Sequence, residues 1–177
     1  MQSTTYQTDL AIISLTAQKK QEENDRFASS LQHQDTLALD RLVHGINKTV
    51  SAAIDCTQCG NCCKTLIINV TRPEAAHLAD HLGMPLADFN DKYIEESQQG
   101  NCFMNTMPCN FLSENKCTVY TNRFKECRDF PHLHKPGFRA RFAGTLMHYG
   151  NCPIIYNVVE ELKQQLAFSD APSAPAI

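Results

Sequence analysis

The sequence predicts a mainly α-helical protein with a small amount of β structure. Its loop-rich cysteine-cluster core is expected to be flanked by an N-terminal helical arm and a C-terminal helix. Three observations lead to this fold class: apolar residues recur at helical spacing near both ends, β-branched runs are short, and all nine cysteines lie between residues 56 and 152. We therefore expect a helical arm over 1–54, a cysteine-cluster domain with the C-terminal helix over 55–168, and a disordered tail over 169–177.

The arm contains no cysteine and two stretches with helical character. The first helix is expected over about 7–30, and its charged middle, KKQEENDR, should be largely solvated. The second helix has an apolar face at three- and four-residue steps, which Gly45 interrupts. That face consists of Leu39, Leu42, Val43, Ile46, Val50, Ala53 and Ile54. Two interpretations stay open: a helical hairpin that packs on the rest of the chain, or an arm that binds a partner or dimerises.

Shorter elements follow the arm. The run TLIINV at 65–70 predicts a strand, because it is apolar and β-branched. The next helix should begin after Thr71, because a proline and then Glu74 follow this residue in the pattern of a capped N-terminus. It should run to Leu82 and stop at Gly83.

The second half of the chain has weaker local signals. Another short helix is expected over about 86–96. Residues 100–152 should be mostly loop and short strand, and a segment of that kind needs a staple to pack. The C-terminal helix should follow Pro153. Its apolar face consists of Ile155, Val158, Val159, Leu162 and Leu166.

The composition narrows the classes of function. The net charge is −3 and the chain has no block of Lys or Arg, which argues against nucleic acid or an anionic membrane as the main partner. No apolar run approaches the length of a membrane span. The N-terminus, MQSTTYQTDLAIIS, lacks the regions of a secretory signal, so a cytoplasmic location is expected. In that reducing compartment, clustered cysteines are more typical of metal or redox chemistry than of disulfides.

The stretch CTQCGNCC at 56–63 concentrates four thiols in eight residues. C-x2-C steps let thiolates converge on one ion, and C-x2-C-x2-C is common around iron–sulfur clusters. Gly60 should relieve the backbone where the chain doubles back. Cys62 and Cys63 are adjacent, and successive side chains of an extended backbone point apart. We therefore expect one of this pair to serve a second metal position or to stay unligated.

The later cysteines are single rather than paired. The second half of the chain should therefore donate ligands one at a time to a site that the first cluster nucleates. Nine cysteines satisfy two four-thiolate sites with one to spare, and a binuclear centre with bridging thiolates is an alternative. The spacing does not distinguish zinc from iron, because thiolates suit both metals.

Taken in order, the motifs resemble those of the YkgJ-type cysteine-cluster proteins, a family described as chelating zinc or iron. A related domain occurs in bacterial flagellin lysine N-methylases. The family pattern begins with C-x2-C-G-x-C-C, here CTQCGNCC, and continues with a strand, a threonine and an acid-led helix, here TLIINVTRPEAAHLADHLG. A Cys-x-Phe-Leu element stands at 109–112, and the last motif, CTVYTNRFKECRDFP, stands at 117–131. Phe124 replaces the proline that the family usually has. The resemblance covers about 56–152 and implies a bacterial metal-binding protein. No methyl-donor site is visible, so the methylase activity does not carry over.

The resemblance and the thiol spacing together give the candidate ligands. The expected metal ligands are Cys56, Cys59, Cys62, Cys63, Cys109, Cys117, Cys127 and Cys152. Tyr120, Arg123 and Arg128 lie inside the last motif and are expected beside the ligands, where arginine can compensate thiolate charge or donate hydrogen bonds to sulfur. An anion-binding or substrate-binding role is the alternative for these three residues. Cys102 has no place in the family pattern and is left out of the ligand set.

Histidines are secondary candidates. They are His77, His81, His132, His134 and His148. The first two share one face of an expected helix and are more typical of a solvated surface. The last three lie close in sequence to expected ligand cysteines, where they could bind metal or donate hydrogen bonds to a ligand.

The function predicted is that of a cytoplasmic metal-binding protein with a Cys-ligated iron–sulfur or zinc centre, acting as a binding or structural module. Two alternatives stay open: an iron–sulfur enzyme or electron-transfer protein, and a thiol redox sensor. The expected partners are a metal ion or cluster and a protein docked by the N-terminal arm, with neither nucleic acid nor membrane. No Gly-rich phosphate loop, nucleophile elbow or nucleotide fingerprint is present, and no catalytic residue is assigned.

Overall fold

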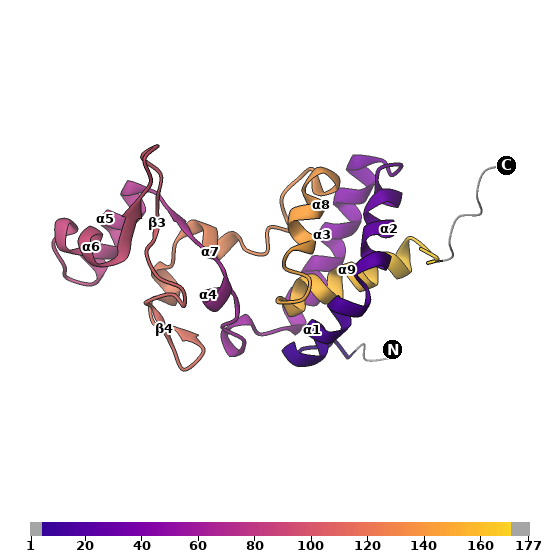
Figure 1. Cartoon of the computed structure of the whole chain (residues 1–177), viewed down its shortest axis with the longest axis horizontal. Coiled ribbons are helices and arrows are strands. Elements are labelled where there is room, and N and C mark those ends of the chain that lie inside the picture. The colour runs from indigo at the N-terminus through magenta and orange to yellow at the C-terminus, as the bar shows by residue number, and fades with distance from the viewer. Residues whose placement is uncertain (1–4, 171–177) are drawn as a thin grey trace. The chain divides into compact units, whose positions relative to one another are not determined.

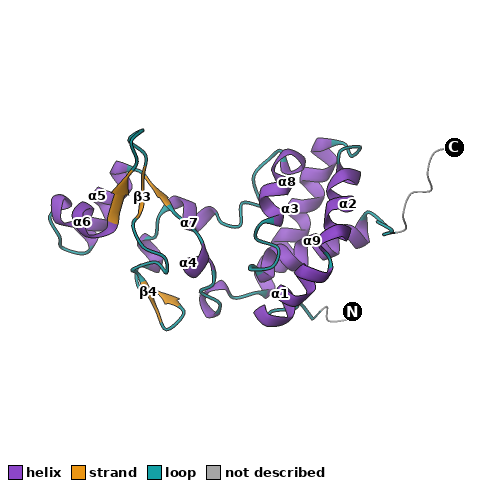
Figure 2. Ribbon diagram, viewed as in Figure 1, coloured by secondary structure: helices purple, strands orange, loops and turns teal. Residues whose placement is uncertain are grey.

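The computed structural model describes residues 5–170, which divide into two compact units. Within the described residues, the helical unit comprises 5–54 and 131–170, and the cysteine unit comprises Asp55–Phe130. In sequence, the cysteine unit is therefore inserted between the two halves of the helical unit. Helices make up most of the regular structure of the described residues (Figure 2), which confirms the expected mainly α fold with small β content.

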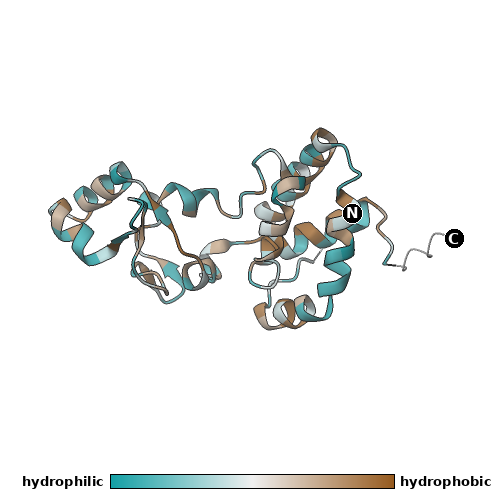
Figure 3. Ribbon diagram, turned by 45° about the horizontal axis from the view of Figure 1, so that its top comes forward, coloured by the Kyte–Doolittle hydropathy of each residue, from teal (hydrophilic) through white to brown (hydrophobic). Residues whose placement is uncertain are grey.

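The helical unit is built from long helices (Figure 1). Within the described residues they are α1 (Leu10–Lys19), α2 (Gln21–Leu31), α3 (Thr36–Ala53), α8 (Phe138–Leu146) and α9 (Pro153–Gln165). α3 packs against α8 and α9, and α1 packs against α2 and α9. Apolar and polar residues alternate along these helices (Figure 3), as expected where each helix buries one face. The buried faces form a core that includes Phe27, Val43, Phe142 and Leu162.

The helix expected over about 7–30 is two helices that meet at Lys20. The Asp9 side chain caps α1 by accepting a hydrogen bond from the Ala11 N–H at 2.8 Å. At Lys20 the backbone leaves helical geometry (φ −97°, ψ 13°) before α2 begins. The charged sequence around Lys20 carries no continuous apolar face that one long helix could bury. The break between α1 and α2 lets Phe27 and Leu31 of α2 reach the core.

α8 lies in the segment that we expected to be loop and short strand. Gly137 and Gly144 weaken the local helix signal. The helix is stabilised by tertiary contacts instead, because Phe138 and Phe142 are buried. Asp40 of α3 accepts hydrogen bonds from the backbone N–H groups of Gly137 (2.8 Å) and Phe138 (2.9 Å). The Asp40 carboxylate, although distant in sequence, thus accepts the hydrogen bonds of backbone N–H groups at the N-terminus of α8.

α9 begins at Pro153, as the sequence predicts, and buries Ile155, Val158 and Leu162. It packs on α3 within the helical unit. We expected this helix to group with the cysteine-cluster segment, but it belongs to the helical unit. The two units divide after residue 54, at the position where we placed the end of the arm. α9 pairs with α3 because the apolar faces of these two helices bury each other. Of the tail expected over 169–177, residues 171–177 lie outside the described residues.

The cysteine unit contains short elements. Its helices are η1 (Cys56–Gln58), α4 (Cys62–Thr65), α5 (Arg72–His81), α6 (Leu86–Tyr93), η2 (Tyr120–Asn122) and α7 (Lys125–Asp129). Its strands are β1 (Asn69–Val70), β2 (Ile94–Glu96), β3 (Cys102–Met104), β4 (Leu112–Ser113) and β5 (Lys116–Cys117). β3 is the central strand of an antiparallel sheet in the order β1-β3-β2, with Asn69 opposite Phe103. β4 and β5 form a separate hairpin.

The capped helix predicted after Thr71 is α5. The Thr71 side chain and Glu74 form a reciprocal capping box, and Gly83 has a left-handed φ of +64° just beyond the C-terminus. The preceding strand, β1, covers Asn69–Val70 of the predicted 65–70, and Thr65 belongs to α4.

A hydrophobic core links the sheet to α5 and α6. It includes Val70, Leu78, Phe89, Met104 and Phe111, all buried. No helix within residues 5–170 is both long enough and apolar enough to cross a membrane.

Candidate metal centre

Six cysteines line one cavity in the cysteine unit. The cavity has a volume of about 150 Å³, and the rest of its wall is mainly apolar. The cysteines are Cys56, Cys62, Cys63, Cys109, Cys117 and Cys127. The charged residues of the wall are Arg123 and Arg128. The cavity therefore combines soft sulfur donors with positive charge, and its described wall contains no carboxylate.

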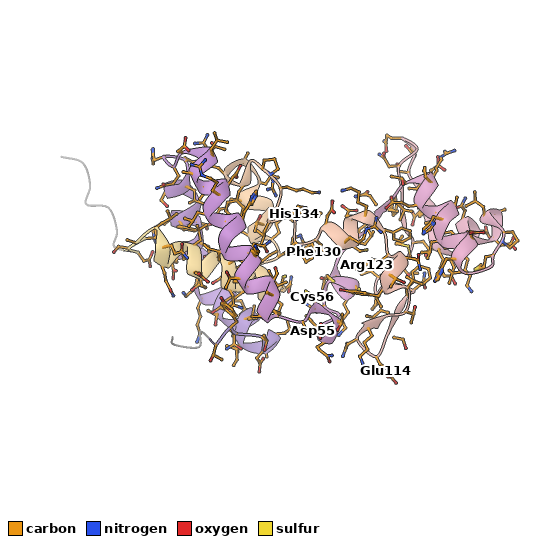
Figure 4. The ribbon with its side chains drawn as sticks, turned by 180° about the vertical axis from the view of Figure 1, so that it is seen from behind. Asp55, Cys56, Glu114, Arg123, Phe130 and His134 are labelled. Atoms are coloured by element: carbon orange, nitrogen blue, oxygen red, sulfur yellow. The ribbon has the colours of Figure 1, made fainter. Side chains whose placement is uncertain are left out.

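Cys56 belongs to a tight turn that its own backbone closes. The Cys59 N–H donates to the Cys56 carbonyl at 3.2 Å, and Asp55 accepts a hydrogen bond from the Thr57 N–H at 2.9 Å. Asp55 and Cys56 are labelled in Figure 4. The C-x2-C step of the sequence is thus a 3-10 turn with a capping carboxylate, which fixes the backbone of the first thiol.

Gly60 lets this turn approach the β4–β5 hairpin. Its φ is +60°, and a Cβ at this position would lie 2.5 Å from the carbonyl oxygen of Asn115. Glu114 and Asn115, the two residues between β4 and β5, both have positive φ, as a tight two-residue hairpin turn requires. Figure 4 labels Glu114 at the tip. The hairpin places Leu112 opposite Cys117, and so brings Cys117 to the cavity.

Cys62 and Cys63 open the short helix α4. Their Sγ atoms are 4.0 Å apart, and both residues line the same cavity. Two thiolates on one tetrahedral zinc lie about 3.8 Å apart, given Zn–S bonds of about 2.3 Å. The premise that these neighbours occupy extended backbone and point apart was therefore wrong, because a helical turn brings the two sulfur atoms together.

Cys109 is held against α4 by the backbone. Its N–H donates to the carbonyl of Cys63 at 2.8 Å, and its own carbonyl accepts from the Leu112 N–H at 3.0 Å. The Cys109 sulfur accepts a hydrogen bond from the Phe111 N–H. Backbone N–H donors to sulfur are a common way to stabilise thiolate ligands.

Cys127 lies on α7, which two carboxylates hold in place. Glu74 accepts a hydrogen bond from the Lys125 N–H at 2.6 Å while it also caps α5. Glu126 accepts hydrogen bonds from the backbone and side-chain amides of Asn69. The sequence identifies Glu74 as a helix cap but gives no sign of its second partner, because Lys125 is 51 residues away.

The three motif residues expected beside the ligands all line the cavity. The Arg123 guanidinium carbon lies 3.8 Å from the centroid of the Tyr120 ring, and Arg123 Nη1 donates to the Tyr120 carbonyl at 2.7 Å. Arg128 donates to the carbonyl of Arg123. Figure 4 shows Arg123 and Cys56 on different segments of the cysteine unit. Burial raises the pKa of the Cys56 thiol, and the positive charge of Arg123 offsets a small part of this rise.

The thiols differ in acidity. Burial raises the pKa of Cys56, Cys109 and Cys127, and raises that of Cys127 to about 12. A hydrogen bond between Cys62 and Cys63 lowers the pKa of Cys62 to about 7 and raises that of Cys63. Cys62 is therefore the member of the adjacent pair that ionises more readily. A bound cation would favour ionisation of the others.

Three other cysteines lie outside the cavity wall. Cys59 sits in the turn that follows η1, next to the cavity residues in sequence. Cys102 is on β3, opposite Val70, and was not expected to be a ligand. Cys152 is buried at the N-cap of α9 and belongs to the helical unit.

The histidines are also outside this wall. His77 Nε2 is 3.2 Å from the Asn122 Oδ1, and His77 and His81 are exposed on α5, as expected of a solvated face. His132, His134 and His148 belong to the helical unit. Burial lowers the pKa of His148.

The donor set fits a soft metal in its chemistry, because thiolates select zinc, copper(I) and iron–sulfur clusters. One cavity collects six of these thiols. Within residues 5–170, no group of three or more His, Cys, Asp or Glu side chains is already arranged to hold an ion. A metal held by several of these thiols would therefore have to draw their sulfur atoms closer together.

The family model CxxCxxCC, described as "Putative zinc- or iron-chelating domain", matches residues 55–152. This chain belongs to the CxxCxxCC family. The matched range includes all eight expected ligand cysteines, and the six that line the cavity come from its first 73 residues, 55–127. No curated protein and no solved structure matches the chain.

Proposed function

We propose that this protein is a cytoplasmic metal-binding module whose cysteine unit holds a Cys-ligated zinc or iron–sulfur centre. The observation that carries the proposal is the convergence of six thiols from separate segments on one cavity. Membership of a family described as chelating zinc or iron supports it. The metal would tie η1, α4, β5 and α7 together, since each of these elements is too short to be stable alone.

The six cavity cysteines are the proposed ligands. Cys59 and Cys152 were also expected to bind metal, and they become secondary candidates because they lie outside the cavity wall. Arg123 and Arg128 offset the negative charge of the thiolates, and Tyr120 holds the Arg123 side chain in place through its ring and carbonyl.

A second candidate function is electron transfer through an iron–sulfur cluster. The mainly apolar wall of the cavity favours it, because burial in an apolar shell is one of the features that set the reduction potential of such clusters. A partner would then receive or supply the electron. The N-terminal arm is the proposed docking segment for a protein partner, and the exposed residues Ile12 and Leu15 of α1 support this role.

Elemental analysis of anaerobically purified full-length protein tests the proposal. We expect zinc, or iron with acid-labile sulfide, in stoichiometric amounts. Cys109→Ser should lose most of the metal, whereas Cys102→Ser, a matched change outside the cavity, should keep it. Cys152→Ser should also keep it if the cavity cysteines suffice. Purified wild-type protein without metal, which also fails to take up zinc or iron after reduction, would show that the proposal is wrong.

A further inference from the structure

Two arginines line the cavity where it meets solvent. Arg123 is half-buried and Arg128 is exposed, and both belong to the cavity wall. Among the described residues, the ion pairs made by arginine involve Arg26 and Arg72 but neither arginine of the cavity. The charge of Arg128 reaches Glu74, but that carboxylate already accepts hydrogen bonds from two backbone N–H groups. The two cavity guanidinium groups therefore lack a carboxylate partner of their own.

The Arg123 side chain is fixed in its orientation (Figure 4). Its guanidinium carbon lies 3.8 Å from the centroid of the Tyr120 ring, and its Nη1 donates to the Tyr120 carbonyl at 2.7 Å. Arg128 is tied to the same segment, because it donates to the Arg123 carbonyl. A cation that only offsets thiolate charge needs no fixed orientation. A guanidinium with a fixed plane can bind both oxygens of a carboxylate through its remaining N–H groups.

The rest of the wall favours a ligand with an apolar body. Phe111, Val119 and Phe124 line the cavity and are buried. The cavity volume of about 150 Å³ is comparable with that of an apolar protein cavity that holds one benzene molecule. An apolar wall also makes a dianion such as phosphate more costly to bind than a monoanion, because burial removes water from the charge. These features together favour a carboxylate that carries a small apolar group.

We propose that the cavity binds a small organic carboxylate beside the metal centre. Arg123 and Arg128 hold its carboxylate, and the apolar wall holds its body. The proposal rests on the proposed function, because the metal would tie together the segments that form the wall. It adds a ligand that metal binding alone does not require. Since both arginines lie where the cavity meets solvent, the carboxylate stays partly hydrated while its apolar body is buried.

Isothermal titration calorimetry of the zinc-loaded, reduced full-length protein with benzoate tests this inference. We expect one benzoate to bind per chain. Benzamide has the same ring without the charge and should bind about tenfold more weakly, because charge-assisted hydrogen bonds are the stronger ones. Acetate lacks the ring and should also bind about tenfold more weakly, because it buries little apolar surface. Inorganic phosphate should bind more weakly than benzoate.

Variants of arginine separate recognition of the carboxylate from compensation of thiolate charge. Arg123→Lys keeps the positive charge but loses the planar fork, so it should keep its zinc and bind benzoate about tenfold more weakly. Arg72→Lys is the matched control, because Arg72 lies outside the cavity wall in the same unit and pairs with Glu96 on the surface. This variant should bind both zinc and benzoate as the wild type does. The zinc content of every sample is measured alongside the titration.

The outcomes distinguish this inference from the proposed function. If wild-type protein with stoichiometric zinc binds benzoate no more tightly than benzamide or phosphate, the carboxylate site is overturned and the metal-binding function stands. Unchanged benzoate affinity in Arg123→Lys also overturns it, because the anion then sits on the metal or elsewhere. Loss of zinc from Arg123→Lys would assign the guanidinium to the metal centre itself and overturn it as well. Wild-type protein that takes up neither zinc nor iron overturns both proposals.

Discussion

At the scale of single residues, Gly60 matters most for bringing the first thiol turn and the β4–β5 hairpin together. The residue combines a left-handed φ with a close approach to the backbone of Asn115. Gly83, in the same unit, has a similar φ of +64°, but nothing lies within 4 Å of a Cβ at that position. A comparison of substitutions at Gly60 and Gly83 therefore separates two free-energy costs: that of the left-handed backbone conformation and that of the contact with Asn115.

We expect Gly60→Ala to destabilise the cysteine unit by about 2–4 kcal/mol, because the left-handed φ costs about 1 kcal/mol and the contact forces the hairpin away. Gly83→Ala should cost only about 1 kcal/mol. Denaturant unfolding and zinc content of the two variants measure the difference. Equal losses of stability, with equal metal content, would show that the contact with Asn115 is unimportant.

Glu74 acts at the same scale, because one carboxylate serves two helices. Burial alone would raise its pKa, but hydrogen bonds from Thr71 and from the Lys125 N–H outweigh burial and lower the pKa. A carboxyl with a lowered folded-state pKa contributes stability above its unfolded pKa of about 4.3 and loses it as the pH falls through the folded value. The contribution is thus complete at neutral pH.

We expect Glu74→Gln to destabilise the cysteine unit by about 1 kcal/mol at pH 7, and by progressively less as the pH falls from the unfolded pKa of about 4.3 towards the lower folded pKa. Glu96→Gln is a suitable control, because Glu96 makes an exposed ion pair with Arg72 that should contribute little. Unfolding curves at several pH values provide the comparison. A Glu74→Gln effect that is the same at pH 7 and pH 3.5 would argue against a role for the ionised carboxylate.

At the scale of elements, α9 is fixed in the helical unit by a buried cation as well as by its apolar face. The Lys163 side chain is 7% exposed, and its Nζ lies 2.7 Å from Glu23, 2.6 Å from Asn24 and 2.9 Å from Glu160. Glu160 also accepts a hydrogen bond from the Tyr149 hydroxyl at 2.7 Å. This polar network joins α9 to α2.

Removing the cation should leave Glu23 and Glu160 with the more exposed Lys20 as their cationic partner, and should take away the hydrogen bond to the buried Asn24 side chain. We expect Lys163→Met to destabilise the helical unit by about 3 kcal/mol, whereas Lys19→Met, at the exposed end of α1, should change stability by less than about 0.5 kcal/mol. Helix content followed by circular dichroism during denaturation measures both. If Lys163→Met is as stable as wild type, the network contributes no net stability and the apolar face alone holds α9.

The same elements show what could be predicted from the sequence. α5 was predicted closely because Thr71, Glu74 and Gly83 are local signals, and α9 because its apolar spacing is regular. α8 was missed because its stability depends on Asp40, which is almost 100 residues away. The cysteines of the cavity were named from their spacing together with the resemblance to a cysteine-cluster family. Their arrangement was not predictable, since it depends on a helical turn at Cys62 and on contacts between separate segments.

At the scale of the whole molecule, the two units differ in what stabilises them. The helical unit buries long apolar faces, among them Phe27, Val43 and Leu162, each of which has no exposed surface. The part of the cysteine unit around the cavity consists of η1, α4, β4, β5, η2 and α7, none longer than five residues. We infer that metal binding contributes much of the stability of this part and little of the stability of the helical unit.

Removal of metal should therefore affect the two units unequally. After treatment with a chelator under reducing conditions, we expect amide hydrogen exchange to become faster by at least tenfold over residues 55–66 and 109–130. Protection in α3 and α9 should change little, because their hydrogen bonds and core contacts lie within the helical unit. Exchange measured by mass spectrometry on peptides from both units tests this, with zinc re-addition as the control for reversibility. A parallel loss of protection in α3 and α9 would mean that the units unfold together and that the metal stabilises the whole chain.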